Sequence, residues 1–337
     1  MSRTSTFAKP FVNAWRALAS LGKPTHLLDG SPKANKLSAK NIAAAVFQGT
    51  PSRTDDRILI RPATKKEPGR VWLADGAGAQ PFADEAATIA VTAADNNLAI
   101  RGLLEPDKIT QALRNSLQVA HQQVQAESVR RSNLQTIEDL SPDSIMITTL
   151  TGILIINQTG YVAHAGDSIA FLARKNAEGN YLDSEGNPLP ESLLILTPDQ
   201  TVGFRMQFDT ESASFPMFWK EWGTFSTRAY TGSDNFETTV RKSLAQGIGL
   251  DIEEAFICQV PLQPSNVLGT CSDGLLKPFF RFYGGKEEGI RQFAIILLTA
   301  LQKNLPLEEV ITKLTLWSLD HDPDDNIALA LLSTEMA

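Results

Sequence analysis

The sequence predicts an α+β fold in which sheets and helices are stacked in layers. Short apolar stretches bounded by turn residues recur along the chain, as is typical of strands. Two stretches with helical spacing of apolar residues separate the early strands from the middle ones, and two more precede the last strand. Because strands and helices do not alternate strictly, a doubly wound parallel sheet fits the pattern less well.

The expected elements follow from these patterns in chain order. Strands are expected at residues 41–48, 57–61, 70–74, 145–156, 161–165, 169–174, 192–197, 266–272 and 327–332. Helices are expected at residues 82–97, 106–135, 290–304 and 307–319. Pro306 stands at the start of the last helix, where proline is tolerated.

Composition excludes several classes of protein. The 337 residues are 42% hydrophobic and 20% charged, which is ordinary for a soluble globular protein. A net charge of −7 argues against a general nucleic-acid binder, which usually has a basic face. There is no apolar run of about 18 residues and no apolar core of a secretory signal, so neither a membrane span nor export is expected. Two cysteines indicate reduced core residues, and we expect a cytoplasmic protein.

The N-terminal part of the chain differs in charge from the rest. Residues 1–45 contain seven basic residues and one acidic residue, and residues 22–40 are rich in Pro, Gly, Ser and Lys, which predicts a loop. We therefore expect residues 1–40 to be a basic N-terminal extension and residues 41–337 to form the main domain. The extension is interpreted either as a loosely attached arm or as a docking segment for an acidic partner.

Aspartates fall at the ends of predicted strands. Asp55 and Asp56 precede the strand at 57–61, and Asp75 follows the strand at 70–74. If these strands form an antiparallel hairpin, the start of the first and the end of the second lie side by side. Asp56 and Asp75 are therefore predicted neighbours.

The same arrangement recurs near the C-terminus. Asp273 follows the strand at 266–272, and Asp325 precedes the strand at 327–332. Several carboxylates at one edge repel each other unless a cation lies between them, and oxygen ligands favour Mg²⁺, Mn²⁺ or Ca²⁺ over zinc. A single Asp-Gly pair is more often a turn than a ligand. The ordered set of such sites is what indicates a metal centre.

These motifs resemble those of the metal-dependent protein phosphatases, the type 2C serine/threonine phosphatase family. The resemblance runs from about residue 42 to residue 333. The matching segments, in order, are 52–57, Asp75-Gly76-Ala77-Gly78-Ala79, Thr148-Thr149, 161–168, 196–201, Cys271-Ser272-Asp273-Gly274-Leu275 and Asp325-Asn326-Ile327. Each motif alone is a weak signal, whereas the ordered set is specific.

The resemblance implies a four-layer α/β/β/α sandwich of two antiparallel sheets flanked by helix pairs, with two Mn²⁺ or Mg²⁺ ions at one end. It implies that Asp75 bridges the metals, that the Gly76 carbonyl binds one of them, and that Asp273 and Asp325 bind the other. Asp55 and Asp56 would bind directly or through water. Asp167 would serve a third, weaker site, so two or three ions are expected. The implied catalytic set is Asp56, Asp75, Asp273 and Asp325.

The sequence departs from the family pattern where phosphate is recognised. Asp55 replaces the usual Glu, Ala77 replaces a His found in some members, and Ile169 replaces an Arg. Pro51 stands where the family often has a phosphate-binding Arg. Arg53 or Arg57 is the candidate substitute for substrate binding, although an arginine at a strand start is also a common surface residue.

We therefore hypothesise a protein serine/threonine phosphatase that hydrolyses phosphomonoesters by attack of a metal-bound hydroxide, with no phospho-enzyme. Its partners would be phosphoserine and phosphothreonine proteins and a kinase that acts on the same substrates. The alternative is a phosphatase-like binding or regulatory module with little turnover. A calcium-stabilised structural domain is a third reading, which the absence of a calcium-loop motif disfavours.

Overall fold

Two antiparallel six-stranded sheets form the centre of the molecule in the computed structural model. The structure describes residues 26–31, 35–39, 41–49, 54–64, 67–77, 82–98, 105–133, 146–197, 256–321 and 323–334. The first sheet has the spatial order β1 (His26–Leu28), β4 (Arg57–Arg61), β5 (Arg70–Ala74), β6 (Leu150–Ile156), β7 (Thr159–Ala165) and β10 (Phe256–Pro261). The second has the order β2 (Lys36–Ala39), β3 (Ile42–Phe47), β12 (Ile327–Ser333), β11 (Val267–Cys271), β8 (Ile169–Ala173) and β9 (Leu193–Ile195).

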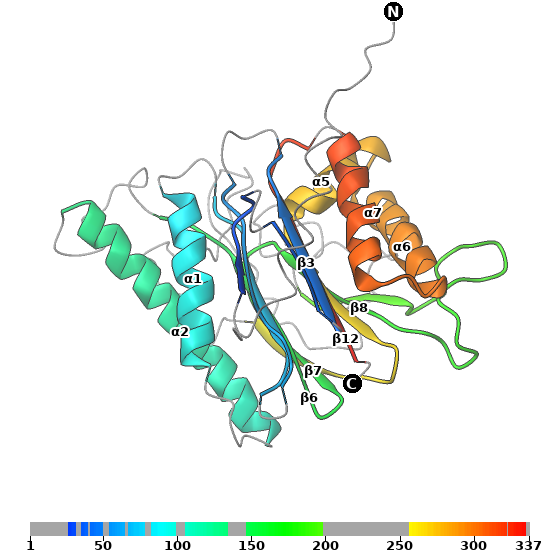
Figure 1. Ribbon diagram of the computed structural model, residues 1–337, viewed down its shortest axis with the longest axis horizontal. Helices are drawn as coiled ribbons and strands as arrows, with labels where there is room; N and C mark the ends of the chain where they lie inside the picture. Colours follow the sequence, from blue (N-terminus) through cyan, green and yellow to red (C-terminus); the bar gives the residue numbers. More distant parts are fainter. Residues whose placement is uncertain are drawn as a thin grey trace, which may run out of the picture.

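Helices cover the outer face of each sheet, as Figure 1 shows. α1 (Ala83–Asn97) and α2 (Pro106–Arg131) cover the first sheet. α5 (Asp273–Phe282), α6 (Lys286–Gln302) and α7 (Leu307–Asp320) cover the second. The predicted four-layer sandwich is confirmed, with three helices where a pair was expected on the second side.

Successive side chains of a central strand point in turn into the core between the sheets and into the core under the helices. This explains why central strands are apolar on both faces. In β3, Ile42, Ala44 and Val46 face the core between the sheets. Ala43, Ala45 and Phe47 of the same strand face the helices. On the other side of the molecule, buried alanines of α1 such as Ala86, Ala90 and Ala94 let this helix pack closely on the first sheet. No helix in the described ranges has both the length and the apolar character needed to span a bilayer.

Four elements were not expected from the sequence. β1 and β2 lie where a loop was predicted, and they pair antiparallel with β4 and β3 as the outermost strands of the two sheets. The loop prediction is therefore wrong at residues 26–28 and 36–39, and a domain start at residue 41 would cut off these two strands. β10 and α5 were also missed. The helix α5 begins with Asp273 and Gly274 and contains Pro278, all of which favour turns in a sequence pattern.

Candidate metal centre

The hairpin of β4 and β5 brings two of the predicted carboxylates together. Arg57 pairs with Ala74, so Asp56 and Asp75 stand next to each other beyond the paired ends. Side chains alternate along a strand, and Ile58 and Leu73 face the core between the sheets. By this alternation Asp56 and Asp75 belong to the same inner side. Asp55 and Asp56 are both buried.

Two threonines before β6 hold the backbone of Asp75. The Asp75 amide donates to Thr149 Oγ1 at 3.0 Å. The Asp75 carbonyl accepts from Thr148 Oγ1 at 2.9 Å and from the Thr149 amide at 2.8 Å. A Cβ on Gly76 would lie 2.5 Å from the Ala83 carbonyl oxygen and 2.9 Å from that of Asp55. Glycine therefore allows this segment to pack against the chain that carries Asp55.

The second pair of carboxylates is assembled by β11, β12 and the start of α5. The Ser272 amide donates to the Ala328 carbonyl at 3.0 Å, which continues the pairing of β11 with β12 to the edge of the sheet. Asp273 is the first residue of α5, and Asp325 lies just before β12. A Cβ on Gly274 would lie 1.9 Å from the Asn326 carbonyl oxygen, so glycine is required for this close approach.

Ser272 joins the two sheets at the centre. Its hydroxyl donates to Asp56 Oδ2 at 2.9 Å and accepts from the Ala328 amide at 3.0 Å. The first bond links an aspartate of the first sheet to the end of β11 in the second. Ser272 lies in the motif at residues 271–275, and no role was predicted for it. Ser272 is four residues after Leu268, so the two side chains point to the same side of the strand. Leu268 faces the core between the sheets, and this periodicity was the signal that could have identified Ser272.

The aspartates at this end of the sheets raise one another's pKa. Burial raises the pKa of Asp56 to about 7, and the negative charges of Asp325 and Asp273 add to the rise. Burial also raises the pKa of Asp75 well above its ordinary value. Four negative charges raise this pKa further, those of Asp56, Asp273, Asp325 and Asp167. Such a cluster is costly in the absence of a cation.

The donor chemistry fits a hard divalent ion. Asp56 Oδ1 is buried and has no hydrogen-bond partner in the part of the chain that the structure describes. Carboxylate and carbonyl oxygens are the ligands that Mg²⁺ and Mn²⁺ prefer. Among the described residues, however, no three acidic, histidine or cysteine side chains are already arranged to hold an ion. The roles of individual ligands therefore stay predictions.

A comparison with known protein families identifies the family of this chain. The family model described as Protein phosphatase 2C matches residues 49–308. The chain belongs to the protein phosphatase 2C family. This result confirms the predicted family and enzyme class, and metal-dependent phosphatase chemistry on phosphoproteins is the function that the family supports.

Solved structures of bacterial serine/threonine phosphatases share the fold. The S. agalactiae enzyme is 17% identical with a TM-score of 0.61, covering 87% of this chain and 99% of that one. PstP/Ppp from Mycobacterium tuberculosis is 18% identical with a TM-score of 0.57, covering 88% and 98%. Stp1 from Staphylococcus aureus is 16% identical with a TM-score of 0.58, covering 89% and 98%. No sequence among the curated proteins matches the chain.

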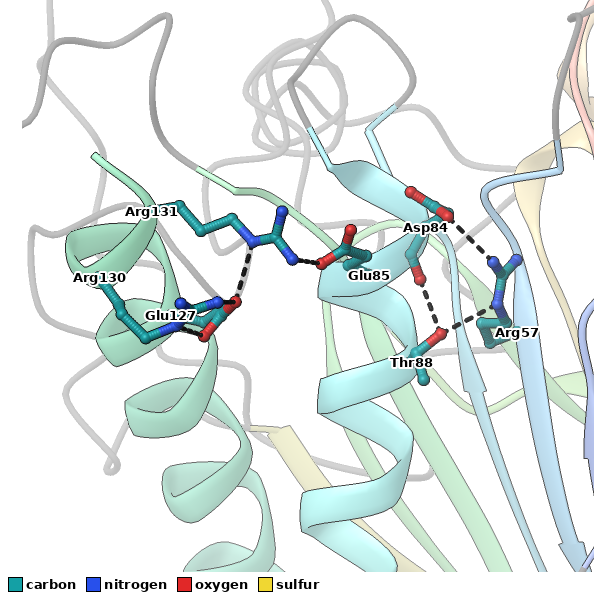
Figure 2. A network of polar contacts seen from close by, with 7 residues as sticks. All are labelled: Arg57, Asp84, Glu85, Thr88, Glu127, Arg130 and Arg131. Atoms are coloured by element: carbon teal, nitrogen blue, oxygen red, sulfur yellow. Dashed lines mark hydrogen bonds and ion pairs between the residues drawn. The ribbon is translucent and has the colours of Figure 1, made fainter. Parts of the chain in front are cut away.

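Arg57 of this phosphatase 2C chain is anchored to α1, as Figure 2 shows. Its Nε donates to Thr88 Oγ1 at 3.0 Å, and one Nη lies 3.4 Å from Asp84 Oδ2. The other Nη donates to the carbonyls of Thr54 and Asp56 at 2.7 and 2.8 Å. Arg57 follows Asp56 on the strand and therefore faces the helices rather than the carboxylates. This arrangement gives Arg57 a structural task and does not support the expected role in substrate binding. Arg53 lies outside the described residues.

The same network continues from α1 to the end of α2 (Figure 2). Arg131 pairs with Glu85 in the first turn of α1, and its Nε lies 2.9 Å from Glu127 Oε1. Its guanidinium also stacks over the Phe82 ring, 4.3 Å from the centroid. The helix layer is thus fixed to the strand that carries Asp56.

The predicted third-site residue Asp167 lies in the turn after β7. His164 bonds Thr151 Oγ1 through Nδ1 at 2.9 Å and the Gly166 carbonyl through Nε2 at 3.0 Å. A carbonyl only accepts, so Nε2 of His164 carries a proton and donates it to the Gly166 carbonyl. Gly166 has a φ of +124°, which favours glycine at this turn. Of the segment at 196–201, the residues after Thr197 lie outside the described ranges.

Lys277 is a residue of the centre that sequence reasoning missed. Its Nζ lies 2.9 Å from Asp273 Oδ2 and 2.6 Å from Asp325 Oδ2. Burial alone would lower the pKa of Lys277, but the negative charges of Asp273 and Asp325 outweigh burial and raise that pKa. The i,i+4 spacing from Asp273 was visible in the sequence, but it has meaning only on a helix, and α5 was not predicted.

Proposed function

We propose that this chain hydrolyses phosphoserine and phosphothreonine esters in proteins, using two or three Mn²⁺ or Mg²⁺ ions. The observation that carries the proposal is the bond from Ser272 to Asp56. It joins two sheets whose ends carry the carboxylates of a phosphatase 2C chain. A protein kinase that makes the same phosphoesters is the corresponding partner. We also propose a cytoplasmic location, which rests on the two cysteines of the sequence.

The residues of the centre have distinct tasks in this proposal. Asp75 and the Gly76 carbonyl, together with Asp56 and Asp55, would hold ions on the side of the first sheet. Asp273 and Asp325 would hold an ion on the side of the second sheet, and Asp167 would hold a third, weaker ion.

Bound divalent ions would activate water and offset charge on the phosphoryl oxygens. Ser272 orients Asp56, and Thr148 and Thr149 fix the backbone of Asp75.

The test is hydrolysis of p-nitrophenyl phosphate and of a phosphothreonine peptide with and without Mn²⁺. Asp273→Asn removes a ligand charge with little change of shape, and we expect it to lower turnover by about two orders of magnitude or more. The matched control is Asp324→Asn, because Asp324 pairs with Arg281 at 2.7 Å in the same loop as Asp325. Turnover that persists in EDTA, or an Asp273→Asn rate equal to that of wild type, would contradict the proposal.

The position of Arg57 favours the second candidate, a phosphatase-like binding module. Its guanidinium is held by Thr88 of α1 and by the carbonyls of Thr54 and Asp56, so this arginine is not available to bind a phosphate at the carboxylates. Calorimetry with Mn²⁺ separates the candidates. Metal binding without hydrolysis of either substrate would indicate the module.

A further inference from the structure

Lys277 contacts two carboxylates that come from different segments. Asp273 is one turn earlier on α5, whereas Asp325 lies in the approach to β12. The three side chains are 24–38% exposed, so the ion pairs are only partly accessible to water. Both carboxylates also raise the pKa of Asp75, which shows that they belong to the same electrostatic cluster.

An ordinary surface ion pair does not account for this geometry. A lysine paired with one acid on an exposed helix contributes little to stability and is readily released to water. Lys108 with Glu105 at the start of α2 is such a pair, with side chains 60% and 69% exposed. Lys277 differs because it bridges two elements and pairs with two carboxylates at once.

We propose that Lys277 is a built-in cation that competes with a divalent ion for Asp273 and Asp325. This half of the centre then binds its ion more weakly than the half formed by Asp56 and Asp75. The inference rests on the proposed function, which makes these carboxylates metal ligands. Lys277 therefore sets the metal concentration at which the phosphatase becomes fully loaded.

The competition follows from the space and charge around the two carboxylates. The ammonium occupies the Oδ2 atoms of both residues at 2.6–2.9 Å. A divalent ion needs oxygens of the same carboxylates at about 2.0–2.1 Å for Mg²⁺. Two cations this close repel each other, so the ammonium must leave before the ion binds. Apparent affinity falls when the binding-competent state is only a fraction of the population.

The experiment is calorimetric titration of the full, EDTA-treated chain with Mn²⁺ at fixed pH and ionic strength. Lys277→Met keeps the apolar stem and removes the charge, and we expect the weaker binding step to tighten at least about tenfold. Lys277→Arg keeps the charge and should stay near wild type. Lys108→Met removes a lysine charge far from the carboxylates and should leave the isotherm unchanged. Lys277→Gln is a second neutral variant, used if Lys277→Met does not fold.

The outcomes of this titration distinguish the role of Lys277 from the phosphatase proposal. A folded neutral variant with the wild-type isotherm overturns the role of Lys277, and if wild type still hydrolyses phosphoesters with Mn²⁺, the phosphatase proposal survives. Absence of Mn²⁺ binding in both wild type and the neutral variants overturns both proposals. Binding that appears only in the neutral variants supports the competition in its strongest form.

Discussion

Asp56 lies where the two sheets meet, and its burial has a consequence for stability. The pKa of Asp56 is about 7 in the folded chain, whereas an aspartate in an unfolded chain has a pKa near 4. Between these values the unfolded chain has released its proton and the folded chain has kept it. The stability that this group contributes to the metal-free protein is therefore present below about pH 4 and is lost as pH rises to about 7.

Asp56→Asn should remove the loss of stability that wild type undergoes between about pH 4 and pH 7. The amide oxygen can still accept from Ser272, but no charge is buried. In EDTA at pH 8 we expect the variant to be more stable than wild type, by roughly 1–3 kcal/mol. At pH 4 the difference should nearly vanish. Urea denaturation at both pH values measures the effect.

Saturating Mn²⁺ provides the control for this prediction. Wild type should gain stability from the ion, while Asp56→Asn should gain less because it has lost a ligand charge. With Mn²⁺ at pH 8, the difference in unfolding free energy between Asp56→Asn and wild type should therefore become smaller or change sign. An Asp56→Asn protein that is less stable than wild type in EDTA at pH 8 would contradict the electrostatic argument.

At the scale of elements, α1 is fixed to the β4–β5 hairpin at both ends. Near the centre, Arg57 binds Asp84 and Thr88 of α1. At the far end, Arg61 and Arg70 pair across the strands, and each donates through Nε to the buried Asp95, at 2.5 and 2.7 Å. One carboxylate therefore binds two adjacent arginines beneath the helix and offsets one of their two positive charges.

Asp95→Asn should destabilise the fold without affecting chemistry. Removing one partner of a buried ion pair leaves uncompensated charge and costs about 3–5 kcal/mol. The control is Glu67→Gln, because Glu67 lies 3.9 Å from Arg70 and is partly exposed, so about 0.5 kcal/mol is expected. Urea denaturation measures stability, and the hydrolysis rate of the folded fraction should be unchanged. A cost of less than about 1 kcal/mol, or a lower rate in the folded protein, would contradict this assignment.

The order of strands and aspartates could be predicted because both depend on local signals. Strand ends fix which residues of an antiparallel hairpin meet, so Asp56 with Asp75 followed from the sequence. Strand alternation turns Arg57 toward α1, where it binds Thr88 and Asp84, so its expected role in substrate binding stays a prediction that these contacts do not favour. Ser272 and Lys277 depend on contacts between distant segments and on the unpredicted α5. Strand periodicity and the i,i+4 spacing place these two side chains on a face, but they do not show which distant residue each contacts.

At the scale of the whole molecule, each sheet ends in a strand that the sequence did not reveal. β1 and β2 are three and four residues long and lie in a segment rich in turn residues. Their register depends on β4 and β3, which follow later in the chain. Leu28 and Leu37 from these strands are buried in the core between the sheets. We therefore propose that the phosphatase domain includes residues 26–39.

Two truncations test where the domain begins. Deleting residues 1–40 removes β1 and β2, exposes the edges of β4 and β3, and takes Leu28 and Leu37 from the core. Loss of a buried leucine costs about 2–5 kcal/mol, and an uncovered apolar edge promotes aggregation. Deleting residues 1–25 is the matched control, because it removes none of the described strands. We expect the longer deletion to give mainly aggregated protein or a clearly lower melting temperature than the shorter one, as measured by size-exclusion chromatography and thermal denaturation. Equal melting temperatures and equal monomer yields would show that the two outer strands are dispensable and that the domain begins at residue 41.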